Sequence, residues 1–184
     1  NNCKQGLADI NLLDGFDLYI SNSSESKFQF LENLNKKNIE NPHIIMPPTE
    51  LFKREEEKLN TKMQSSNLDF YYCGTLSKHK NVYSLLEIFN KWNKDHSKLS
   101  IFTSFSKDDT LGYLGKNKYM EFQGKGISFF HRLNDLEMSK LKTSMHCFIT
   151  FSMHEGFCIP LFNSIENLSP TISYPLKCLE DYLS

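Results

Sequence analysis

The chain has 184 residues, of which 39% are hydrophobic and 13% aromatic, and its formal net charge is −1. This composition is enough for a real core, and a charge so near zero argues against a nucleic-acid binder that works through bulk charge. No apolar run approaches the ~20 residues of a membrane-spanning helix, and no signal peptide is visible. The five cysteines are scattered and lack C-x-x-C spacing, which favours a reduced, cytosolic compartment over a zinc site or disulfide framework.

The two ends of the sequence suggest a piece of something longer. The chain opens "NNCKQG" without an initiator methionine and closes "CLEDYLS" without an evident terminal element. We therefore expect it to be a fragment.

The first third of the chain predicts the end of one domain. Residues 16–21 ("FDLYIS") and 43–46 ("HIIM") are typical of strands. Between them, the serines of "SNSSES" can cap a helix that carries Phe28, Leu31 and Leu34 on one face. A sheet-and-helix unit is expected here.

A change of composition then predicts a boundary. "PPTE" halts regular structure, and the charged stretch "LFKREEEKLNTKMQSSN" that follows lacks an apolar stripe. We therefore predict the end of an amino-terminal, Rossmann-like domain in residues 1–46, a hinge or linker in 47–67 and a second Rossmann-like domain in 68–184.

Strands and helices alternate through this second domain. The expected strands are "FYYCG" (70–74), "LSIFTS" (99–104), "GISFF" (126–130), "HCFITF" (146–151) and "PTISY" (170–174). Such alternation predicts an α/β fold, with a parallel sheet covered by helices on both faces and linked by right-handed crossovers.

Two of the three expected helical segments carry local signals. "NVYSLLEIFNKW" places Val82, Leu85, Leu86, Phe89 and Trp92 at the spacing of one buried face. Asn134 and Glu137 form the pattern of a capping box that opens the helix "DLEMSKLKTS". Residues 106–125 are harder to interpret, and one helix is expected there.

Two strand-to-helix connections could hold an anion, because a helix start offers unpaired N–H groups and a positive dipole end. In "GTLSKHKN" (74–81), Gly74 permits close approach of a ligand and Lys80 adds a positive charge. In "HEGFCIP" (154–160), Gly156 does the same, Glu155 offers an acceptor for hydroxyls, and the following proline suits the first turn of a helix. A cation and a carboxylate on neighbouring turns suit a ligand with a diphosphate and a sugar.

These segments resemble a known family. "HEGFCIPLFN" is similar to the E-G-F-G/C-x-P-L-x-E signature of the retaining glycosyltransferases of family 4, which have the two-domain GT-B fold. "FYYCGTLSKHKN" resembles their Y-x-G-R-L-S-x-x-K-N turn, and "ISFFHRLNDLEMSKL" resembles V-x-F-x-G-x-V-S-D-E-E-L. "DLYISNSSESKFQFL" and "PHIIMPPTELF" resemble the last strand, helix and hinge of the amino-terminal domain. The order of the landmarks implies that residues 68–184 are the carboxy-terminal, donor-binding domain.

The resemblance implies a nucleotide-sugar site. Glu155 would hold hydroxyls of the donor sugar and is the expected catalytic residue, and Lys80 would contact the diphosphate. The other implied donor-binding residues are Gly74, Thr75, Gly156, Phe157, Cys158, Asn163, Arg132 and Leu133. Of these, the backbone N–H groups of Gly156 through Cys158 would meet the sugar and phosphates, and Arg132 and Leu133 would line the base pocket.

The implied reaction transfers a sugar, with retention of configuration, from a nucleotide-diphosphate sugar to a glycan or lipid-linked acceptor. No cofactor and no divalent metal are expected, in line with the lack of a D-x-D motif. Nucleic acid is not an expected partner. The acceptor would meet the amino-terminal domain, and the protein would be cytoplasmic, with peripheral contact at the inner face of the membrane left open.

The sequence also departs from the family pattern. The second glutamate of the signature falls on Asn163, and the arginine that joins the lysine on the diphosphate falls on Thr75. The glycine of the F-x-G strand end falls on His131, and that of the A-x-G-x-P-V-I segment on Leu168. The loss of one charged hydrogen bond costs ~1.5–3 kcal/mol, so Thr75 alone could weaken donor binding roughly 10- to 100-fold.

Alternatives therefore stay open. The departures at Thr75 and Asn163 suit a degenerate, non-catalytic relative that binds a nucleotide or a partner, and an unrelated doubly wound nucleotide-binding domain is a third possibility. Single residues also have simpler roles. Glu155 could cap the next helix, Lys80 could be a solvated lysine, and Cys158 is expected to be a packed side chain. For Asp108, Asp109, His131 and His154, helix capping or polar turn roles are favoured over metal binding.

Overall fold

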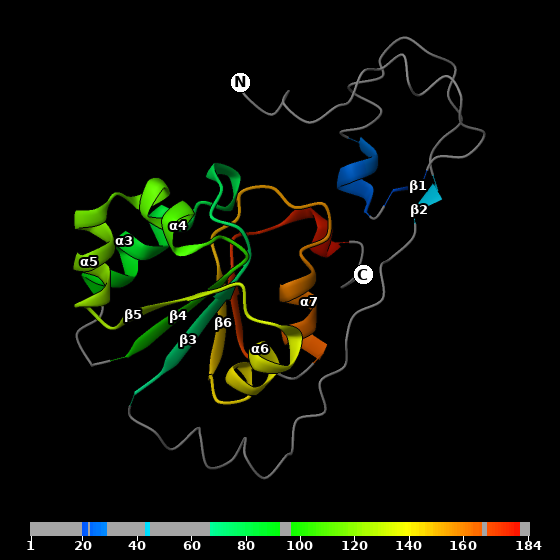
Figure 1. Cartoon of the computed structure of the whole chain (residues 1–184). Helices are drawn as coiled ribbons and strands as arrows, with labels where there is room; N and C mark the ends of the chain where they lie inside the picture. The colour runs from blue at the N-terminus through cyan, green and yellow to red at the C-terminus, as the bar shows by residue number, and fades with distance from the viewer. Residues whose placement is uncertain are drawn as a thin grey trace. The chain divides into compact units, whose positions relative to one another are not determined.

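The structure, a computed structural model, describes residues 20–21, 23–28, 43–44, 67–92, 97–166 and 169–180. Figure 1 shows these residues as coloured ribbon. The chain divides into two compact units. The described residues of the first unit are 20–21, 23–28, 43–44, 155–157 and 177–180, and the rest belong to the second.

The second unit is built on a five-stranded sheet with the order β5-β4-β3-β6-β7. Every neighbouring pair of strands is parallel. The strands are β3 (Asp69–Cys73), β4 (Lys98–Thr103), β5 (Ile127–His131), β6 (Cys147–Thr150) and β7 (Thr171–Ser173). The sequence prediction of an α/β fold with a parallel sheet is confirmed, and all five expected strands are present.

Burial explains why these segments form strands. β6 is buried at every position, as are five of the six residues of β4. Such strands have helices over both faces, so a continuous apolar run replaces the alternation of a half-exposed strand. β7 lies at the edge of the sheet, and its Ile172 is 47% exposed.

Helices cover both faces of the sheet (Figure 1). On one face lie α3 (Val82–Trp92), α4 (Lys107–Leu114) and α5 (Lys116–Gln123), and on the other lie α6 (Asp135–Lys142) and α7 (Ile159–Glu166). The chain adds β4 and β5 on one side of β3 and then returns to place β6 on its other side. The order of the strands therefore reverses between β3 and β6, which is where open parallel sheets bind ligands.

Helix α3 buries the face that its sequence predicts, with one exception. Val82, Leu85, Leu86 and Phe89 are at most 3% exposed, whereas Trp92 is 49% exposed. The prediction that Trp92 is buried was wrong because the last turn of the helix reaches the rim of the core. The indole still packs edge-on against Phe70, with ring centroids 5.7 Å apart.

Residues 106–125 form two helices where the sequence analysis expected one. Gly115 separates α4 from α5 with a φ of 79°, a left-handed conformation that favours glycine. Its N–H donates to the carbonyl of Leu111 and closes α4. Asp109 belongs to a capping box with Ser106 at the start of α4, so the predicted capping role is confirmed for this aspartate.

The capping box predicted at the start of α6 is also present. The Asn134 side chain accepts a hydrogen bond of 2.9 Å from the Glu137 amide, and the Glu137 carboxylate accepts one of 3.0 Å from the Asn134 amide. Pro160 lies in the first turn of α7, as expected.

The described part of the first unit contains a short parallel pair, β1 (Ile20–Ser21) and β2 (His43–Ile44). Residues 24–28 are helical, and the Ser23 hydroxyl accepts a 3.1 Å hydrogen bond from the Ser26 amide, as a capping serine does. The 3-10 helix η3 (Lys177–Leu179) belongs to this unit, and Lys177 Nζ lies 3.6 Å from a Glu25 carboxylate oxygen.

Several expectations lie outside the described residues. They include most of the 16–21 strand, the helix face at Leu31 and Leu34, and nearly all of the predicted linker 47–67. The predicted domain boundaries at 1–46, 47–67 and 68–184 therefore stay predictions. None of the helices in the described ranges is long and apolar enough to cross a membrane.

Candidate functional site

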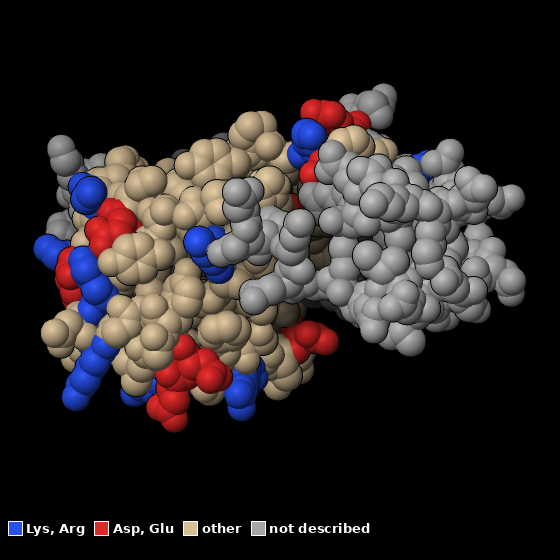
Figure 2. Space-filling model, turned by 90° about the horizontal axis from the view of Figure 1, so that it is seen from above, with Lys and Arg blue, Asp and Glu red and all other residues tan. Residues whose placement is uncertain are grey.

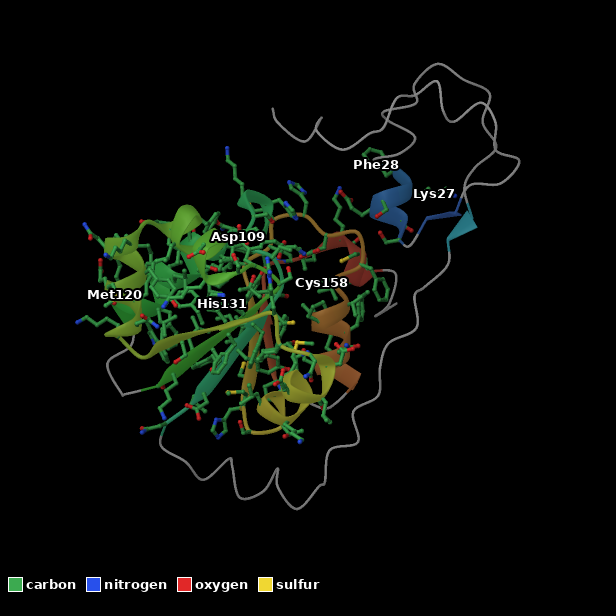
Figure 3. All side chains as sticks on the ribbon, viewed as in Figure 1. Lys27, Phe28, Asp109, Met120, His131 and Cys158 are labelled. Carbon is green, nitrogen blue, oxygen red and sulfur yellow. The ribbon has the colours of Figure 1, made fainter. Side chains whose placement is uncertain are left out.

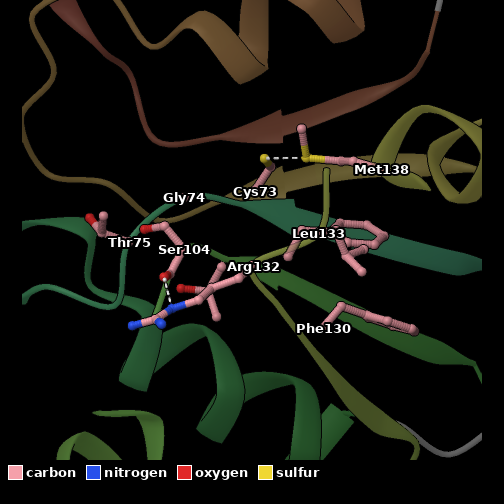
Figure 4. Close-up of a pocket in the computed structure, with 10 residues that line it drawn as sticks. Cys73, Gly74, Thr75, Ser104, Phe130, Arg132, Leu133 and Met138 are labelled. Atoms are coloured by element: carbon pink, nitrogen blue, oxygen red, sulfur yellow. Dashed lines mark hydrogen bonds between the residues drawn. The ribbon is translucent and has the colours of Figure 1, made fainter. Parts of the chain in front are cut away.

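A pocket of about 460 Å³ opens at the carboxyl ends of β3, β4 and β5 (Figure 4). Most of its wall is apolar, and the thiol of Cys73 on β3 lies 3.5 Å from the sulfur of Met138 on α6. Phe130 of β5 also lines it and stacks on Phe102 of β4, with ring centroids 5.2 Å apart. The strand ends therefore border an open pocket with a mostly apolar, partly aromatic wall.

Gly74 shapes the first turn of this pocket. Its φ is 155°, and a Cβ at this position would lie 2.7 Å from the hydroxyl of Tyr72. That hydroxyl donates a 2.9 Å hydrogen bond to the carbonyl of Thr75. The Gly74 amide donates to the carbonyl of Phe102, so the turn is fixed to the end of β4. Only glycine fits this backbone, which brings the main chain of residues 74 and 75 to the pocket wall.

The same turn continues into a short 3-10 helix, η2 (Lys78–Lys80), which precedes α3. It ends at Asn81, which adopts a left-handed φ of 51°. The Met153 amide, in the connection after β6, donates a 2.9 Å hydrogen bond to the carbonyl of His79. The connections that follow β3 and β6 therefore lie side by side at the point where the strand order reverses.

A second wall of the pocket is formed where β5 ends. Arg132 has a left-handed φ of 50°, and its amide donates a 2.8 Å hydrogen bond to the carbonyl of Thr103. Its Nε lies 3.4 Å from the Ser104 carbonyl, and its Nη2 lies 3.6 Å from the carboxylate of Asp109. Hydrogen bonds from Ser106, and then the charge of Arg132, lower the pKa of Asp109.

The Cys73 thiol is a wall group with little nucleophilic character. Burial raises its pKa, although the charges of Lys142 and Lys80 act in the opposite sense. Because the thiolate is the reactive form, a raised pKa argues against nucleophilic catalysis by Cys73.

The structure brings four of the predicted site residues together around this pocket. They are Gly74, Thr75, Arg132 and Leu133. Lys80 lies at the end of η2, in the connection that follows the wall residue Thr75, and is not part of the lining. Cys158 and Asn163 are not part of the lining.

The remaining predicted residues lie on the connection between β6 and α7 and on α7 itself. Glu155 and Gly156 are half-buried and Phe157 is buried, and these three residues belong to the first compact unit. Cys158 and Asn163 belong to the second unit. Cys158 is 7% exposed and has a left-handed φ of 60°, so its prediction as a packed side chain is confirmed.

His131 has a polar role at the end of β5. Its Nδ1 lies 3.2 Å from the carbonyl of Phe105 and 3.4 Å from the hydroxyl of Thr110. Figure 3 labels Asp109 and His131, which lie at the adjoining ends of α4 and β5. Within the described ranges, no three His, Cys, Asp or Glu side chains gather as metal ligands would.

Sequence reasoning missed most of the pocket wall. The unpredicted wall residues are Cys73, Phe102, Thr103, Ser104, Phe130 and Met138. One signal was available, because ligands of a parallel sheet lie beyond the carboxyl ends of its strands, and the ends at 104 and 130 were predicted. Local sequence patterns do not predict which strands lie next to one another in the sheet.

The surface around this end of the sheet has no single sign of charge. Seen from above, Lys and Arg side chains are interspersed with Asp and Glu around the rim of the described residues, and Lys or Arg atoms also lie near the middle among uncharged residues (Figure 2). This view agrees with the exclusion of bulk electrostatic binding of nucleic acid.

No protein-family model matches the sequence, and no curated protein matches it. Solved structures do match. HepE from Anabaena, in complex with UDP and glucose, has a TM-score of 0.73 and 16% identity over 95% of this chain and 49% of its own. WaaG, a glycosyltransferase involved in lipopolysaccharide biosynthesis, has a TM-score of 0.62 and 12% identity over 89% of this chain and 46% of its own.

A third similar structure is the carboxy-terminal domain of LpcC, a glycosyl transferase group 1 family protein from Francisella tularensis. Its TM-score is 0.52 and its identity 14%, over 70% of this chain and 68% of that domain. These similarities show that the chain has the fold of GT-B glycosyltransferases. The chain spans about half the length of HepE and WaaG.

Proposed function

We propose that this chain forms the donor-binding part of a retaining glycosyltransferase. The protein would transfer a sugar from a nucleotide-diphosphate sugar to a glycan or lipid-linked acceptor. Two independent observations support this proposal: the fold is that of GT-B glycosyltransferases, and a pocket lies at the carboxyl ends of β3, β4 and β5.

The observation that carries the proposal is the composition of this pocket. Its volume of about 460 Å³ is within the range of small-molecule sites, and its mostly apolar wall, which includes Phe102 and Phe130, suits a nucleobase. Beside it, the glycine turn at Gly74 and Thr75 brings main chain to the wall, and Lys80 follows in η2. A base in the pocket would direct its phosphates toward this turn, where an anion is stabilised.

In the proposed reaction the nucleoside diphosphate is the leaving group, and negative charge develops on it as the bond to the sugar breaks. A cation fixed beside the leaving phosphate lowers the barrier because its attraction grows in the transition state. Lys80 has this role, so the reaction needs no divalent metal. Glu155 accepts hydrogen bonds from hydroxyls of the donor sugar and orients the sugar for transfer, while backbone N–H groups of Gly156 to Cys158 meet the sugar and the phosphates.

Retention follows, in this proposal, when the acceptor enters on the face from which the phosphate leaves. The acceptor would be bound by an amino-terminal domain, and we propose that residues 68–184 alone transfer sugar poorly because the cleft needs both walls. Cytoplasmic location, with peripheral contact at a membrane that holds a lipid-linked acceptor, belongs to the same proposal.

An equilibrium titration of the protein with UDP, GDP and ADP tests the proposal. Saturable binding of one diphosphate, weakened in Lys80→Ala, supports it. Binding without any sugar transfer, in a protein that includes the acceptor domain, would favour the non-catalytic alternative. No binding of any of the three by the folded protein would refute it.

A further inference from the structure

The pocket wall contains a single charged side chain, that of Arg132. All other lining residues are apolar or neutral: Cys73, Phe102, Phe130, Leu133 and Met138 form most of the wall, and the rest are Gly74, Thr75, Thr103 and Ser104. Arg132 is therefore the charged group of this lining that a charged ligand would meet, and its counterion, Asp109, lies outside the lining.

The position of Arg132 is fixed by its backbone and two contacts. The Arg132 amide binds the Thr103 carbonyl, which holds the residue at the end of β5 beside β4. The guanidinium then extends along the wall toward Ser104 and Thr75 (Figure 4). It therefore points to the side of the pocket on which the Gly74 turn lies.

These contacts leave the guanidinium able to bind a ligand. The Nε contact with Ser104 is long, at 3.4 Å, and the ion pair with Asp109 at 3.6 Å joins two well-exposed groups. Such exposed pairs contribute little to stability, and a guanidinium has further N–H donors in a planar fork that matches phosphate. Asp109 is held by Ser106 through bonds of 2.6 and 3.0 Å, so its carboxylate orients Arg132 from the rim.

The backbone conformation of Arg132 is a second argument for a ligand-binding role. A left-handed φ of 50° is unfavourable for a residue with a side chain, and the weak ion pair with Asp109 does not account for it. Strain of this kind is often found where a side chain is positioned for a ligand.

We infer that Arg132 contacts the diphosphate of the donor and supplies the second cation that the turn lacks at Thr75. This inference rests on the proposed function and changes the role expected for Arg132, which the sequence analysis placed at the base. Lys80 then binds the diphosphate from the β3 turn and Arg132 binds it from the end of β5.

The test compares a nucleoside diphosphate with its own nucleoside. The diphosphate is whichever of UDP, GDP and ADP the wild-type protein binds. Affinities are measured for the wild type, Arg132→Gln, Arg132→Lys and the double variant Arg132→Gln with Thr75→Arg, each shown to be folded by its thermal transition. The double variant moves the guanidinium to the other side of the pocket.

We expect Arg132→Gln to weaken binding of the diphosphate roughly 10- to 100-fold and binding of the nucleoside by less than about twofold. Arg132→Lys should keep part of the affinity, and Thr75→Arg should restore part of it in the double variant. Equal loss for diphosphate and nucleoside, or no loss, would overturn the inference while the proposed function stands. Failure of the wild type to bind any of the three diphosphates would instead refute the proposed function.

Discussion

The hydroxyl of Tyr72 lies directly beneath Gly74, where a Cβ would come within 2.7 Å of it. The same hydroxyl holds the carbonyl of Thr75 by a 2.9 Å hydrogen bond. Tyr72 and Gly74 therefore determine the shape of the turn that leads from β3 to Lys80, and this turn forms one wall of the pocket.

Gly74→Ala should lower the free energy of unfolding by about 1–3 kcal/mol, because the added Cβ meets both an unfavourable φ and the Tyr72 hydroxyl. Tyr72→Phe on the same background should recover part of the loss, since it removes the atom that the Cβ contacts. Urea denaturation of both variants, with Tyr72→Phe alone as control, measures the coupling. If the free-energy changes of Gly74→Ala and Tyr72→Phe simply add in the double variant, the contact between the new Cβ and the Tyr72 hydroxyl does not contribute to the loss.

Lys80→Ala should weaken binding of the nucleoside diphosphate roughly 10- to 100-fold, because it removes one charge-assisted hydrogen bond. The matched control is Lys98→Ala, which removes an exposed lysine at the amino end of β4, away from the pocket. Calorimetric titration of the two variants distinguishes a specific contact from the general effect of one lost charge. Equal affinities in both would contradict a role for Lys80.

Glu155→Ala should weaken an intact sugar nucleotide about 10-fold or more and leave the free diphosphate within about twofold, because the carboxylate is proposed to bind the sugar. His154→Ala, an exposed neighbour on the same connection, serves as control. Parallel titrations with the sugar nucleotide and the diphosphate provide the comparison. An equal loss of affinity for the sugar nucleotide and for the diphosphate would instead indicate that Glu155 has a structural role.

Asn134→Ala should lower the free energy of unfolding by about 1 kcal/mol, because it removes the side-chain acceptor for the Glu137 amide at the start of α6. Asn117→Ala, at an exposed position inside α5, provides a control that keeps the chemical change but removes no cap. Urea denaturation should show a loss only for Asn134→Ala. The same midpoint for both variants would mean that the capping box contributes nothing.

Burial raises the pKa of Cys147 to about 11, because the thiolate is disfavoured inside the sheet. The unfolded thiol ionises near pH 8.5, so the unfolded state loses its proton first as the pH rises. Stability from this group is therefore complete below about pH 8.5 and falls as the pH approaches 11. Cys147→Ala and Cys147→Val should lack this part of the alkaline slope, which denaturation between pH 7 and pH 11 would measure; an unchanged slope would contradict the assignment.

The sequence allowed much of the fold to be predicted because the relevant signals are local. The strands of the second unit are short β-branched and aromatic runs, and the Asn134–Glu137 capping box depends on two residues of one turn. The break at Gly115 was also a local signal, but the weak apolar pattern around it did not reveal that two helices share the segment.

The pocket could be predicted only in part for a physical reason. Gly74 and Arg132 were found through motifs, whereas Phe102, Phe130 and Met138 look like any other core residues in the sequence. They face one space because β5, β4 and β3 are adjacent, and this order depends on pairing between distant segments. The long-range order of a sheet is not encoded in the periodicity of its individual strands.

The most direct test of the account is a crystal structure of the protein with the nucleoside diphosphate that it binds. We expect a base between Phe130, Leu133 and Cys73, with the diphosphate at the Gly74 turn within reach of Lys80 and Arg132. A nucleotide bound elsewhere, with this pocket empty, would contradict it.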